Sequence, residues 1–109
     1  MITAQEIQKG VELARDASVD FFITKLSGKD QFACGFAWVD VYVDRTNSKQ
    51  AKELLAAGFR KDYKPKCVSM WNPGGLAVQN VDAKEAGAEA MAAYLRALGL
   101  NAYAGSRLD

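Results

Sequence analysis

The stretch FACGFAWVDVYVD, from Phe32 to Asp44, decides the fold because its side chains alternate strictly in type. Successive side chains of a β-strand point to opposite faces of a sheet, so the pattern predicts a strand with two different faces. One face carries the small side chains of Ala33, Gly35, Ala37, Val39, Val41 and Val43. The other carries Phe32, Cys34, Phe36, Trp38, Asp40, Tyr42 and Asp44. We expect helices to pack on the small face and a different partner to meet the large aromatic face.

Three helices are predicted around this strand from their end signals. Thr3 and Glu6 form a capping box, so the first helix should start at Ala4 and end near Ser27–Gly28. The second should be capped by Asn47 with Gln50 and should end in a Schellman motif, with Gly58 after the cap and Phe59 folded back on Leu54. The third should open with a second capping box, Asp82 with Glu85, and end at Gly99–Leu100.

The turn sequence WNPGG, from Trp71 to Gly75, predicts a hairpin. Asn, Pro and two glycines are typical of a type I turn closed by a left-handed glycine. In that interpretation the strand Cys67–Trp71 pairs with Leu76–Val81, and a short edge strand follows at 101–105.

The order of elements is then one helix followed by strand, helix, strand, strand, helix, strand. We therefore expect one α+β domain spanning residues 1–109, in which an N-terminal helix precedes a ferredoxin-like βαββαβ antiparallel sheet with its helices on one face. Fold alone carries no function.

The aromatic strand face is the first candidate binding surface. It gathers Phe36, Trp38, Tyr42 and, from the second long strand, Trp71. Exposed apolar patches are rare on monomers, so the first helix, a second copy of the chain or a ligand should cover it. Tryptophan and tyrosine are favoured at interfaces because each joins a large apolar body to a polar group. We expect a homodimer or a complex with another, unidentified protein.

The second candidate surface is the segment RKDYKPK. It places four cations around one aromatic ring: Arg60, Lys61, Tyr63, Lys64 and Lys66. Cations beside a stacking residue are typical of loops that contact single-stranded nucleic acid, although such a segment is more often a solvated connection.

Composition excludes several classes of function. The chain of 109 residues has a net charge of +1 and no histidine, which removes histidine-based catalysis and histidine–metal chemistry. Cys34 and Cys67 are expected to be reduced and buried. Asp40 and Asp44 are separated by four strand residues, about 13 Å, which is too far for one ion. We expect no enzyme activity, no cofactor and no metal site.

The stretches GFAWVDV (35–41), WNPGG (71–75) and AGSRLD (104–109) resemble small uncharacterised bacteriophage proteins. The resemblance implies a phage accessory protein that acts on a host or phage macromolecule. The beginning of the chain carries no secretory signal and no apolar run is long enough to cross a bilayer, so we expect a cytoplasmic protein without a membrane role.

The hypothesis from sequence is thus a small, non-enzymatic interaction protein. The alternative is a protein that binds single-stranded nucleic acid through the aromatic face and the basic segment.

Overall fold

The computed structural model describes residues 1–109 as three helices and four strands. In chain order the elements are α1 (Ala4–Thr24), β1 (Gly35–Tyr42), α2 (Lys49–Ala56), β2 (Arg60–Lys61), β3 (Cys67–Trp71), α3 (Val81–Ala97) and β4 (Asn101–Leu108). The strands form one sheet in the order β2-β3-β1-β4, and every neighbouring pair is antiparallel. The predicted α+β class is confirmed.

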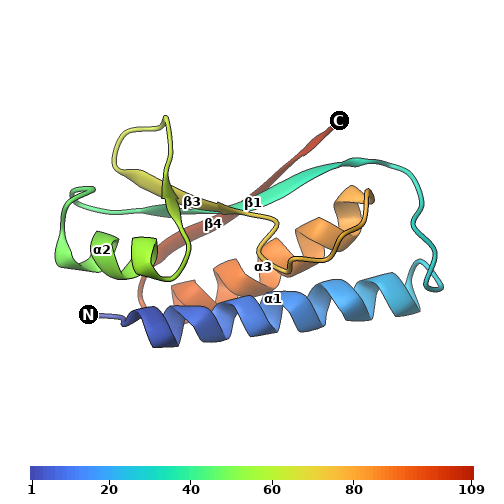
Figure 1. The fold of residues 1–109 in the computed structure, drawn as a ribbon, viewed down its shortest axis with the longest axis horizontal. Coiled ribbons are helices and arrows are strands. Elements are labelled where there is room, and N and C mark those ends of the chain that lie inside the picture. The colour runs from blue at the N-terminus through green and yellow to red at the C-terminus, as the bar shows by residue number, and fades with distance from the viewer.

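All three helices lie on one side of the sheet, as Figure 1 shows. The small face of β1 meets them: Ala37, Val39 and Val41 are at most 1% exposed. The predicted alternation of β1 is therefore confirmed, and it places the core between this face and the helices. Other members of the core are Ile7, Ala14, Leu54, Phe59, Val68, Met91, Leu95 and Ala102.

Helix α1 packs mainly on α3 and not on the aromatic face of β1. Gly10 and Gly87 allow the two helices to approach closely: a Cβ atom on Gly87 would lie 2.3 Å from Ser18 Oγ. Polar bonds fix the crossing, since Ser18 Oγ donates to the carbonyl of Ala83 and the Tyr94 hydroxyl donates to that of Glu6, each at 2.8 Å. Of the three expected covers for the aromatic face, the first helix is therefore excluded.

The end signals of the helices were predicted in part. The capping box of Thr3 and Glu6 is confirmed. So is the Schellman ending of α2, where the amide of Phe59 donates to the carbonyl of Leu54 at 3.0 Å. The predicted Asn47 cap is wrong, because Ser48 is the residue whose side chain accepts from an amide of the first turn.

The predicted Asp82 cap of α3 is also wrong. Asn80 caps that helix: its side-chain oxygen accepts from the amide of Ala83 at 2.9 Å. Its amide nitrogen donates to the carbonyls of Gln31 and Phe32. This fully buried side chain therefore joins the start of α3 to the segment before β1.

The predicted hairpin between Cys67–Trp71 and Leu76–Val81 is wrong. β1 pairs along the whole of β3 on one side and β2 pairs with Val68 and Ser69 on the other, and Leu76–Val81 does not pair with β3. A turn does form, with the Gly75 amide donating to the carbonyl of Asn72 at 2.9 Å. It directs the chain down to α1, where buried Gly74 would place a Cβ 2.5 Å from Ser18 Oγ.

The predicted strand Cys67–Trp71 is confirmed as β3, but it is the third strand along the chain, because β2, a two-residue strand, immediately follows the Schellman turn of α2. None of the three helices combines the length and apolar character that a membrane crossing requires.

Candidate interaction face

The side of the sheet opposite the helices is called the open face below. Strand register assigns its residues: Phe36, Trp38, Asp40 and Tyr42 from β1; Cys67, Ser69 and Trp71 from β3; Asn101, Tyr103, Gly105 and Arg107 from β4; and Arg60 from β2. No helix covers this face, and only the loop between β2 and β3 rises over it (Figure 1). It holds all four aromatic residues that the sequence predicted for the aromatic strand face: Phe36, Trp38, Tyr42 and Trp71.

One end of the open face is an aromatic cluster of Phe36, Trp38 and Trp71. The two indoles are stacked, with ring centroids 4.9 Å apart, because Trp38 and Trp71 are directly opposite each other on neighbouring strands. Phe36 meets Trp71 edge to face at 5.9 Å. Trp71 remains 50% exposed, so this cluster presents an aromatic surface to solvent.

Gly105 makes room for this arrangement. It lies opposite Trp38 on β4, and a Cβ atom at this position would be 2.6 Å from the indole ring. The indole of Trp38 therefore lies across the backbone of β4, and its Nε1 donates to Asp40 Oδ2 at 3.2 Å.

A tyrosine pair forms the other end of the open face. Tyr42 and Tyr103 meet edge to face at 6.2 Å, and they are 37% and 51% exposed. Tyr63, from the loop above, is almost fully exposed. The aromatic residues of the open face thus form two separate groups.

Between the two groups is a polar centre of Asp40, Asp62, Lys64, Cys67 and Ser69. Lys64 Nζ lies 2.8 Å from Asp40 Oδ2 and 3.4 Å from Asp62 Oδ2. Ser69 Oγ donates to Asp62 Oδ1 at 3.4 Å, and the amide of Lys64 donates to Asp62 Oδ2 at 3.2 Å. Asp40 is 8% exposed, and its second oxygen, Oδ1, has no hydrogen-bond partner.

These contacts shift the proton affinities of the polar centre. The hydrogen bond to Asp40 raises the pKa of Lys64, so this ammonium stays charged. Desolvation by itself would raise the pKa of Asp62, but the hydrogen bonds and charge of Lys64 outweigh it, and this pKa lies below its ordinary value. Desolvation raises the pKa of the Cys67 thiol to about 11, and the nearby charge of Asp40 adds to the effect. Cys67 is thus a protonated thiol at neutral pH.

The predicted basic segment does not form one basic surface. Lys64 is paired with carboxylates, and its side chain is only 28% exposed. Arg60 lies on the open face, whereas the register places Lys61 on the opposite side of the sheet edge. Lys61 and Lys66 line a polar depression together with Asp44, Arg45, Thr46 and Asn47. The cations of 60–66 therefore lie on more than one side of the sheet edge, and one of them is neutralised by carboxylates.

Other cations lie beside the aromatic cluster instead. The guanidinium of Arg107 is 5.4 Å from the Phe36 ring and 5.7 Å from the Trp71 ring, within range for a cation–π contact. Lys84 Nζ is 5.4 Å from the Phe36 ring and also donates to the carbonyl of Gly35. The sequence reasoning missed Arg107, Lys84 and Tyr103. The alternation Asn101, Tyr103, Gly105, Arg107 would have revealed two of them, had the last strand been extended beyond 105.

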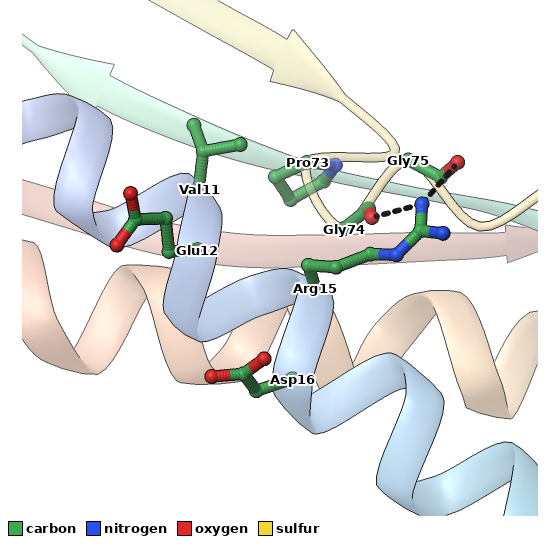
Figure 2. Close-up of a pocket in the computed structure, with 7 residues that line it drawn as sticks. All are labelled: Val11, Glu12, Arg15, Asp16, Pro73, Gly74 and Gly75. Atoms are coloured by element: carbon green, nitrogen blue, oxygen red, sulfur yellow. Dashed lines mark hydrogen bonds between the residues drawn. The ribbon is translucent and has the colours of Figure 1, made fainter.

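A second depression, of about 440 Å³, lies on the helix side between α1 and the turn after β3. Figure 2 shows Arg15 reaching from α1 to the turn, where its guanidinium donates to the carbonyls of Gly74 and Gly75. Val11 and Pro73 are the only apolar side chains that line this depression. Because the one cation is already bonded to backbone, we interpret this depression as the packing of the turn rather than as a binding site.

The chain was compared with protein-family models, curated proteins and solved structures, and none of them matches it.

Proposed function

We propose that this protein is a non-enzymatic interaction protein that binds through its open face, and that a second copy of the chain is its first partner. The observation that carries the proposal is the aromatic surface on a sheet face without a covering layer. Trp71, Tyr103 and Tyr42 are between 37% and 51% exposed there. Exposed apolar patches mark interaction sites, and tryptophan and tyrosine are enriched among interface hot spots.

Two electrostatic features favour a second copy. The chain has a net charge of +1, so two molecules repel each other little. The charges at the polar centre are already paired within one chain, since Lys64 contacts Asp40 and Asp62. Covering a paired centre costs less desolvation energy than covering isolated charges.

The architecture belongs to the same proposal. We infer a ferredoxin-like topology, supported by the strand order β2-β3-β1-β4 and by a chain order of strand, helix, strand, strand, helix, strand after α1. The setting we propose, from the resemblance to small bacteriophage proteins, is a phage accessory protein in the cytoplasm of the host.

Light scattering coupled to size-exclusion chromatography tests the assembly. At high micromolar concentration the measured mass should be about twice the 11.9 kDa of the chain, and Trp71→Ala should shift it towards the monomer. Leu13→Ala is the matched control, because Leu13 is 43% exposed on α1, away from the open face. A strictly monomeric protein at that concentration would remove the dimer from the proposal.

Single-stranded nucleic acid is the second candidate partner, favoured by the position of Arg107 over the rings of Phe36 and Trp71. Stacked bases together with phosphate–cation contacts would use both features. Binding of an oligonucleotide should quench tryptophan fluorescence, weaken with added salt and weaken again in Arg107→Gln. Absence of quenching at low salt would end this alternative.

A further inference from the structure

The polar centre of the open face has the composition of a cation site. Asp40, Asp62 and Cys67 each offer one ligand atom, and the three atoms lie within 4.8 Å of one another. Three atoms at such separations can share a centre about 2.8 Å from each, so shifts of about 0.5–0.8 Å bring them to the usual Zn–S and Zn–O distances. The ligands come from three parts of the chain: β1, the loop after β2, and β3.

An independent observation indicates that the centre is built for a further ligand. Asp40 is 8% exposed, and Asp40 Oδ1 is buried without a hydrogen-bond partner. A buried carboxylate oxygen without a partner is costly, and native proteins seldom leave one in place without a reason. Cys67 is fully buried beside it, and its thiol donates a long hydrogen bond, 3.7 Å, to the carbonyl of Val68.

We propose that Asp40, Asp62 and Cys67 bind a divalent ion of the Zn²⁺ class, and that the ammonium group of Lys64 competes with the ion for this place. A set of two carboxylates and one thiolate suits Zn²⁺ better than Mg²⁺ or Ca²⁺, which take oxygen ligands only. Three protein ligands leave a fourth position of the tetrahedron for water or for Ser69, whose hydroxyl already bonds to Asp62.

Lys64 already acts as the cation of this centre. Its Nζ lies between the two carboxylates, 2.8 Å from Asp40 and 3.4 Å from Asp62. Because the side chain is 28% exposed, the ammonium can move out to solvent without crossing the core. Metal binding thus exchanges one cation for another: Lys64 leaves still protonated, and Cys67 releases its thiol proton to solvent as the sulfur–metal bond forms.

Titration with Co²⁺ tests the proposal directly, because a thiolate–cobalt bond gives a charge-transfer absorption band that carboxylates alone do not. We expect this band at one equivalent of metal in the wild type, and in Lys64→Met an affinity at least about tenfold higher, since the competing charge is gone. Zn²⁺ should displace Co²⁺ and should raise the Tm of Lys64→Met more than that of the wild type.

The two cysteines supply the matched control. Cys67→Ser should lose the band, whereas Cys34→Ser should keep it, because Cys34 is a half-buried free thiol outside the cluster. Circular dichroism reports whether Cys67→Ser is folded. If Cys67→Ser is not folded, Asp62→Asn decides the question. This variant keeps the Cys67 thiol, and its affinity for Co²⁺ should still fall.

Absence of the band in both the wild type and Lys64→Met would overturn the proposal. So would a band that survives in Cys67→Ser, or one that disappears equally in Cys34→Ser. The ligands belong to one chain, so this test does not depend on the proposed dimer, and a negative result would leave that proposal untouched.

Discussion

Gly105→Ala should disturb the open face through Trp38, although the substitution adds only one methyl group. The new Cβ atom would lie 2.6 Å from the indole ring. The ring must retreat by about 1 Å to reach an ordinary contact distance, and it can move only outward, away from the sheet. That movement separates it from Trp71 and from Asp40 Oδ2, its hydrogen-bond acceptor.

The expected cost follows from these two contacts. Loss of the stacked pair costs about 0.5–1.5 kcal/mol, and loss of a hydrogen bond to a charged group costs about 1.5–3 kcal/mol. Alanine recovers about 0.5–1 kcal/mol relative to glycine in a strand. We expect a net destabilisation of about 1–4 kcal/mol, with a fall in Tm of about 4–8 °C for each kcal/mol.

Urea denaturation followed by tryptophan fluorescence measures the free energy of unfolding, and the coupled circular dichroism of the two indoles reports their stacking. The decisive comparison repeats Gly105→Ala in a Trp38→Ala background. There the added methyl group meets no ring, so the substitution should be neutral or slightly stabilising. An equal cost in both backgrounds would refute the reasoning.

Two further predictions concern the helix crossing and the polar centre. Gly87→Ala should lower the free energy of unfolding by about 1–2 kcal/mol in urea, because its Cβ would meet Ser18 Oγ at 2.3 Å and this clash exceeds the gain in helix propensity. Gly10→Ala should cost less, because its Cβ would meet the side chains of Tyr94 and Met91 at 3.1 and 3.2 Å. A Gly87→Ala protein more stable than the wild type would contradict the tight crossing of α1 and α3. Asp62 has a pKa below its ordinary value of 3.8, so the stability it contributes is present above about pH 4 and is lost as the pH falls through the lower, folded value. Urea titrations at several pH values should show a shallower acid loss in Asp62→Asn, and parallel curves for the two proteins would count against this role.

The sequence predicted those features that depend on neighbouring residues. The alternation from Phe32 to Asp44 identified the two faces of β1, and the end signals at Thr3 and Gly58 identified where α1 begins and α2 ends. Each depends on a spacing of a few residues, so local sequence suffices.

Features that depend on competition between distant segments were not predictable in this way. WNPGG favours a hairpin locally, but β1 and β2 occupy the two sides of β3 and leave the following segment to pack against α1. The local sequence likewise shows Lys64 only as one of four cations in a short segment. Its pairing with Asp40, 24 residues away, depends on the path of the loop over the open face.

The packing of α1 against α3 has a consequence for synthesis of the protein. The Tyr94 hydroxyl and the Glu6 carbonyl that it bonds are 88 positions apart, and the chain between them holds most of the sheet. A ribosome that has released only the first half of the chain has delivered Ile7 and Ala14 without Met91 and Leu95, their neighbours in the finished core. Contacts between remote segments form late, so the apolar side of α1 stays uncovered until nearly the whole protein has been synthesised. During that interval we expect it to be a binding site for chaperones.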